Sequence, residues 1–147
     1  MSNTRHPMRR HTLRILLGTT AALLTFPALA SPSKREIDKR LLGTWRSNKE
    51  KTTGLWRYTK EMTPAARERF EKIFGKFTLR FSETHIFTEF EGTKDVVPYT
   101  VVAQDKTSVV IAWLEKEGTS LQHIHFEENG YYILSGYNVE FYTNVPA

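Results

Sequence analysis

Apolar and polar residues alternate through most of the second half of the chain, from Lys76 to Thr143. In the first segment, Phe77, Leu79 and Phe81 are separated by single polar residues. Successive side chains of a strand point to opposite faces, so this pattern predicts a strand with one buried face. Further segments follow, with turn residues such as Asn129-Gly130 between them. The expected strands cover residues 76–82, 85–91, 96–103, 108–114, 119–126, 131–134 and 138–143.

The connections between these strands are too short for parallel pairing, which needs crossovers of a dozen or more residues. The strands therefore form an antiparallel meander. The edges of such a sheet must be protected, either by closure into a barrel or by curling around a helix.

A strand and a helix are expected before the meander. Residues 43–47 predict a short strand that carries a buried Trp45. A helix is predicted over residues 64–74, because Thr63 can cap its first amides and Gly75 can end it.

The remaining segments have weaker patterns. Residues 34–42 predict a short helix, whereas residues 48–62 are polar and have little periodicity. The strand over residues 108–114 is apolar on both faces. We expect the helix over residues 64–74 to cover its outer face, or that face to bind a partner.

The first 30 residues have the composition of an export signal. They contain four Arg and no acidic residue, and an apolar run over residues 15–29 precedes a small-x-small site at Ala28-Leu29-Ala30. The run is short for a membrane span, so a retained anchor is only the alternative. We expect cleavage before Ser31, a mature domain over residues 31–147, and a periplasmic or secreted location. The Sec route is expected, with the twin-arginine route as the alternative because of Arg9-Arg10.

Removal of this leader changes the charge of the protein. The leader holds 4 of the 21 Lys and Arg and none of the 16 Asp and Glu, so residues 31–147 carry a net charge of +1. Nucleic-acid binding therefore loses its electrostatic basis. The chain has no Cys, which excludes disulfides, thiolate zinc sites and thiol catalysis.

The mature layout has eight strands, with Gly43-Thr44-Trp45 on the first and a helix between the first and second. This layout and the Gly-x-Trp resemble the lipocalins, and also small exported bacterial proteins that begin with a Gly-Thr-Trp strand. The lipocalin resemblance implies an eight-stranded antiparallel meander closing into a barrel. Trp45 would plug its floor, and the connection over residues 48–75 would lie over its mouth. In lipocalins a basic residue near the last strand packs across that Trp, but residues 131–147 contain no Arg or Lys. A cystatin-like α+β roll is the alternative fold.

The lipocalin resemblance implies a cup that binds a small apolar or amphiphilic molecule without catalysis and without a cofactor. The alternative for the interior is a barrel packed full of aromatic side chains. A different function, binding of a protein partner or an inhibitor-like role, would use an exposed apolar surface. The candidate ligand-binding residues are Trp45, Trp56, Phe81, Tyr99 and Trp113.

His123 and His125 are the sharpest candidates for chemistry. Residues two apart on a strand share a face, so both imidazoles could bind one metal ion. Glu127 would continue that face, and His85 could approach from another strand. The alternative is that both histidines are exposed on the outer surface. No sequence motif supplies a third metal ligand or a nucleophile, so catalysis is not expected, and a metal-dependent enzyme at His123 and His125 is the least favoured alternative.

Overall fold

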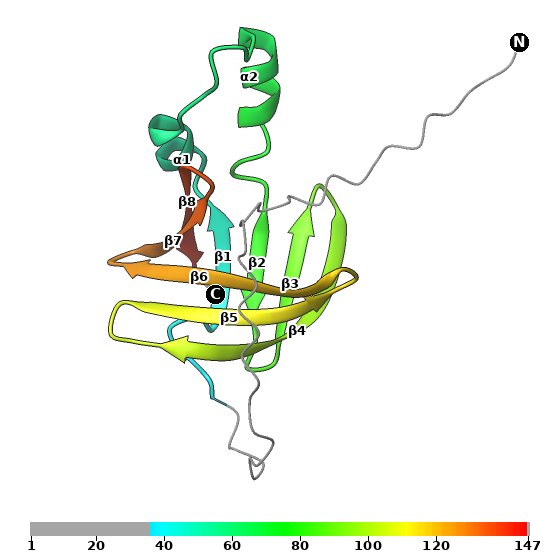
Figure 1. Ribbon diagram of the computed structural model, residues 1–147, viewed down its shortest axis with the longest axis vertical. Coiled ribbons are helices and arrows are strands. Elements are labelled where there is room, and N and C mark those ends of the chain that lie inside the picture. The colour runs from blue at the N-terminus through cyan, green and yellow to red at the C-terminus, as the bar shows by residue number, and fades with distance from the viewer. Residues whose placement is uncertain (1–35, 147) are drawn as a thin grey trace, which may run out of the picture.

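The computed structural model describes residues 36–146, and the predicted leader and its cleavage site lie outside them. Eight strands form a closed barrel, in which each strand pairs antiparallel with the next and β8 pairs with β1 (Figure 1). The expected eight-stranded barrel is confirmed, and the cystatin-like roll is wrong because the sheet closes on itself. The strands are β1 (Gly43–Ser47), β2 (Thr78–Phe81), β3 (His85–Phe90), β4 (Thr93–Gln104), β5 (Ser108–Glu115), β6 (Gly118–Glu127), β7 (Gly130–Ser135) and β8 (Asn138–Val145).

The turn between β3 and β4 is tighter than the sequence predicted. Glu91 and Gly92 both have positive φ, 49° and 83°, as a two-residue hairpin turn requires. β4 therefore begins at Thr93, where the pattern had indicated a longer turn over residues 92–95.

The strand register assigns the inward face of every strand. Trp45 lies opposite Leu79, and Phe81 lies opposite Ile86, so the alternating apolar residues point into the barrel. The tightly buried part of the interior comprises Leu41, Trp45, Phe81, Ile86, Tyr99, Val109, Ile111, Ile124, Tyr131, Ile133 and Tyr142.

The segment before β1 closes one end of the barrel. The expected helix over residues 34–42 is wrong for the described residues, which form turns there. Leu41 is fully buried, and its carbonyl accepts a hydrogen bond of 2.8 Å from Trp45 Nε1. Arg40 pairs with the buried Asp38 at 2.6 Å and lies 4.3 Å from the ring centroid of Phe126. These tertiary contacts outweigh the local helical pattern.

Two helices lie at the other end, which we call the helix end. α1 (Lys49–Leu55) begins at Asn48, whose side chain accepts from Lys51 N at 2.9 Å. The sequence did not predict α1. α2 (Pro64–Glu71) is capped by Thr63 as expected and projects away from the barrel (Figure 1). Neither helix is long and apolar enough to cross a membrane, and the same holds for any helix within residues 36–146.

α1 packs against the outer face of β8. Thr52 is fully buried, and its Oγ1 accepts a hydrogen bond of 3.0 Å from Phe141 N. By contrast, the outer face of β5 stays open, and Leu114 is 74% exposed. The expectation that the helix over residues 64–74 covers this face is wrong.

Candidate functional site

Four of the five predicted ligand-binding residues share the interior of the barrel. Trp45 is buried near the closed end and meets the Tyr131 ring edge-on at 5.0 Å between centroids. Phe81 and Tyr99 are also buried and pack edge-on at 5.6 Å. Trp113 points inward nearer the helix end and is only half-buried.

The fifth residue, Trp56, lies outside this group. Its ring packs against Phe70 at 5.1 Å and Phe74 at 5.5 Å, between the two helices and the start of β2. Trp56 therefore helps to hold the connection between β1 and β2 together. The structure does not bring it to the other four aromatic residues.

The interior is packed unevenly from one end to the other. At the closed end, inward side chains such as Ile124 are almost completely buried. Towards the helix end, Leu79, Val97 and Trp113 also point inward, yet each stays partly exposed. Solvent therefore reaches apolar side chains on the inner face of the barrel at this end, and it also reaches the inward Phe126 at the closed end.

A buried carboxyl lies on this inner face. Glu140 of β8 is 4% exposed, and it faces inward because it lies two residues from the inward Tyr142. Tyr142 Oη donates to Glu140 Oε2 at 3.3 Å, and the Ser135 side chain also hydrogen-bonds to this carboxyl. Burial raises the pKa of Glu140, and these two hydrogen bonds only partly oppose the shift.

Two tyrosines, Tyr131 and Tyr142, lie beside this carboxyl. The rings of Tyr131 and Tyr142 stack with centroids 4.9 Å apart. Burial and then the nearby Glu140 raise the pKa of both hydroxyls well above the ordinary value. Tyr131 Oη is buried and has no hydrogen-bond partner within residues 36–146. Buried hydroxyls without a partner are rare, because each loses its hydration without compensation.

His123 and His125 lie on the outer face of β6. Their ring centroids are 4.0 Å apart, and His125 stacks on Tyr132 at 4.8 Å. Burial and the neighbouring His123 lower the pKa of His125. Glu127, which continues this face, forms an ion pair with Lys51. His85 lies on β3, which does not pair with β6. Within the described residues, no three His, Asp or Glu side chains gather as metal ligands would.

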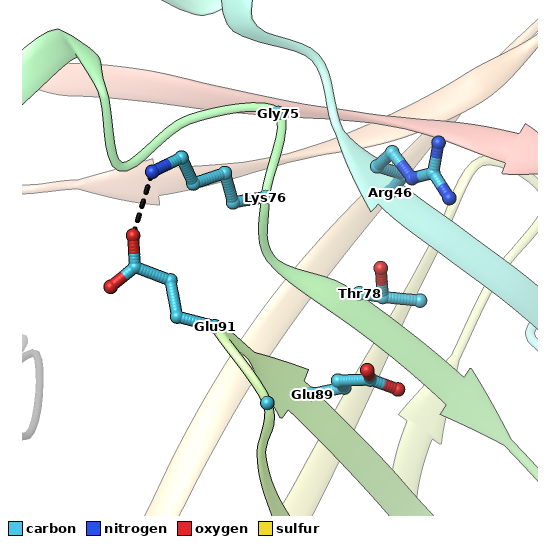
Figure 2. Close-up of a pocket in the computed structure, with 7 residues that line it drawn as sticks. Arg46, Gly75, Lys76, Thr78, Glu89 and Glu91 are labelled. Atoms are coloured by element: carbon cyan, nitrogen blue, oxygen red, sulfur yellow. Dashed lines mark hydrogen bonds and ion pairs between the residues drawn. The ribbon is translucent and has the colours of Figure 1, made fainter.

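A hollow of about 410 Å³ lies on the outer surface where β1, β2 and β3 approach the helix end. Arg46, Thr78 and Glu89 come from these three neighbouring strands, and Figure 2 shows them beside the ion pair of Lys76 with Glu91. The lining is polar and exposed, and its opposite charges compensate one another. This hollow therefore lacks the apolar, enclosing walls that are typical of a small-molecule site.

A second hollow, of about 490 Å³, lies at the closed end. Arg40, Trp45 and Phe126 contribute to its lining. The Arg40 guanidinium also donates to the carbonyl oxygens of residues 105, 106 and 108, at 2.9–3.2 Å. Arg40 is thus fixed as a lid on this end. The lipocalin resemblance implies a basic residue near the last strand at this end. Here the basic residue at this end is Arg40, which precedes β1.

Sequence reasoning missed Glu140 and the two tyrosines as members of the site. The alternation in residues 138–143 does place Glu140 and Tyr142 on one face. Which face points inward depends on the pairing of β8 with β1, where Tyr142 lies opposite Ser47. The useful signal was an acidic residue on the same strand face as an aromatic residue.

Comparison with known proteins gives no relative to guide this assignment. No protein-family model, curated protein or solved structure matches the chain. The function of this chain is therefore inferred from its residues and their geometry.

Proposed function

We propose that this chain is an exported, lipocalin-like protein that binds a small apolar or amphiphilic molecule without catalysis. The ligand lies on the inner face of the barrel at the helix end. The observation that carries the proposal is the partial exposure of Leu79, Val97 and Trp113, although all three point inward. Apolar side chains that solvent reaches inside a barrel gain stability when a ligand covers them.

Three further observations support the proposal. Leu41, Trp45 and Arg40 cover the closed end, so that the helix end is the entrance that we propose for a ligand. The Gly43-x-Trp45 pattern lies on the first strand, with the Trp buried near the floor. The leader predicted over residues 1–30 would place the domain outside the cytoplasm, where such binders work.

Native mass spectrometry of the protein produced from Ser31 is the first test. A labile extra mass of a few hundred daltons would support the proposal and identify the ligand class.

A calorimetric titration with decanol tests the site itself. Trp113→Ala should weaken decanol binding, whereas Leu114→Ala should not, because Leu114 is the next residue on β5 and faces outward. Equal binding by both variants would refute the placement. Decanol binding by Trp56→Ala tests whether the connection over residues 48–75 also contacts the ligand.

Export is tested separately. Expression of the full chain in a Gram-negative host should yield a periplasmic protein whose first residue is Ser31. A full-length protein in the cytoplasm would refute the export proposal and leave the binding site untouched.

A second candidate function is binding of a protein partner by the outer surface of β5 and β6. Leu114 is 74% exposed and Leu121 is 53% exposed on this surface. Crosslinking should yield a defined complex that Leu121→Glu abolishes. Leu55→Glu is the control, because Leu55 is 63% exposed but belongs to α1 and not to the sheet surface of β5 and β6. A complex that survives Leu121→Glu would reject this surface.

A further inference from the structure

The charged residues that face into the barrel from its strands all have the same sign. The register places Asp95 of β4, Glu115 of β5 and Glu140 of β8 on the inner face. The Lys and Arg of the strands, Arg46, Arg80 and Lys94, all lie on the outer face. Since a concave surface lined by one sign of charge concentrates the opposite sign, this interior favours a cation.

Glu140 is the acid that is most poorly compensated. Only 4% of it is exposed, and no Lys or Arg of residues 36–146 forms an ion pair with it. Its hydrogen bonds come from neutral hydroxyls, those of Tyr142 and Ser135. A buried carboxylate without a cation is unfavourable, so a core designed only for packing would place an apolar residue here.

The carboxyl is nonetheless close to the entrance. Ser135 and Asn138, which form the next strand pair towards the helix end, are half-buried. Glu140 therefore lies one residue pair below solvent. Tyr131 Oη lies near this carboxyl, is buried without a hydrogen-bond partner in residues 36–146, and can accept a hydrogen bond.

An alkylammonium group satisfies these groups together. It supplies the missing positive charge for Glu140 and up to three N–H donors, one of which a tyrosine oxygen can accept. Resting on the binding function proposed above, we propose that the ligand carries a cationic amine that pairs with Glu140. Its apolar part then lies against Leu79, Val97 and Trp113.

Three probes that share a ten-carbon chain test this proposal: decylamine, decanol and decanoate. Calorimetry at pH 7 should show that decylamine binds about tenfold tighter than decanol, a difference of about 1.4 kcal/mol. Decanoate should bind most weakly, because its charge has the same sign as the interior. Glu140→Gln should abolish the preference for decylamine over decanol. Glu89→Gln is the control, since Glu89 is an exposed carboxylate on the outer face of β3.

The outcomes separate the two proposals. If decanol binds and decylamine binds no tighter, the amine proposal fails and the binding function stands. The amine proposal also fails if Glu140→Gln keeps the preference. If no probe binds, the binding function fails and the amine proposal fails with it. A cooperative thermal melt of Glu140→Gln, followed by circular dichroism, demonstrates that this variant is folded.

Discussion

The contact between Thr52 and Phe141 gives a sharp test of how α1 is held on the barrel. Thr52 is completely buried, with 0% of its surface accessible to solvent. Its Oγ1 accepts a hydrogen bond of 3.0 Å from Phe141 N. Thr52→Val keeps the shape of the side chain but removes that acceptor. The buried N–H of Phe141 is then left unsatisfied, which costs about 1–3 kcal/mol. At about 4 °C per kcal/mol for a domain of this size, Tm should fall by about 4–12 °C.

Thr53→Val is a matched control for that substitution. The Thr53 hydroxyl donates only to the Lys49 carbonyl within α1, and the residue is half-buried. Both variants change helix propensity equally, so Thr53→Val should stay within about 0.5 kcal/mol of the wild type. Urea unfolding measures both free energies, and amide hydrogen exchange reports on the Phe141 N–H directly. Equal stabilities for the two variants, with undiminished protection at Phe141, would refute the reasoning.

The remaining predictions concern a glycine, a histidine and the buried glutamate. Gly130→Ala should destabilise the barrel severely, because the new Cβ would lie 2.1 Å from a backbone carbonyl oxygen of β8. Gly54→Ala is the control, because its Cβ would meet nothing within 4 Å, and it should change stability by at most about 1 kcal/mol. Thermal melts measure both variants. His125 should titrate below an ordinary histidine in NMR, and His123→Asn should move its pKa upward because a nearby positive charge is removed; an unchanged titration would contradict this. The folded state raises the pKa of Glu140, so its contribution to stability is present below the ordinary glutamate pKa and is lost as pH rises through the raised value. Glu140→Gln should therefore gain stability relative to the wild type between acidic and neutral pH, as measured by urea unfolding, and a constant difference would contradict the assignment.

The strands were predictable because alternation is a local property. Phe81 and Ile86 belong to segments whose pattern repeats every two residues, and both point inward. α1 was not predictable in this way. It is a helix of 7 residues without an apolar stripe, held by the Asn48 cap and by the contact of Thr52 with β8. Such contacts exist only after the chain has folded.

The interior site was predictable only in part. Trp45 and Trp113 could be expected inside because aromatic residues on strands fill barrels. Arg40 was unexpected at the closed end, because its partners are backbone carbonyls near Asp105, far along the sequence. The exposed fraction of an inward side chain depends on which side chains from other strands pack over it at each end of the barrel. No local pattern in the sequence encodes this exposed fraction.

The pairing of β1 with β8 also has a kinetic consequence. Thr44 lies opposite Val145, so the last seam joins residues from opposite ends of the described chain. Contacts between distant residues form slowly, because the intervening chain loses entropy before they are made. Until β8 arrives, β1 and β7 each present an unpaired edge that another chain could join. We therefore expect folding on the slow side for a protein of this size, with the highest risk of aggregation before the seam closes.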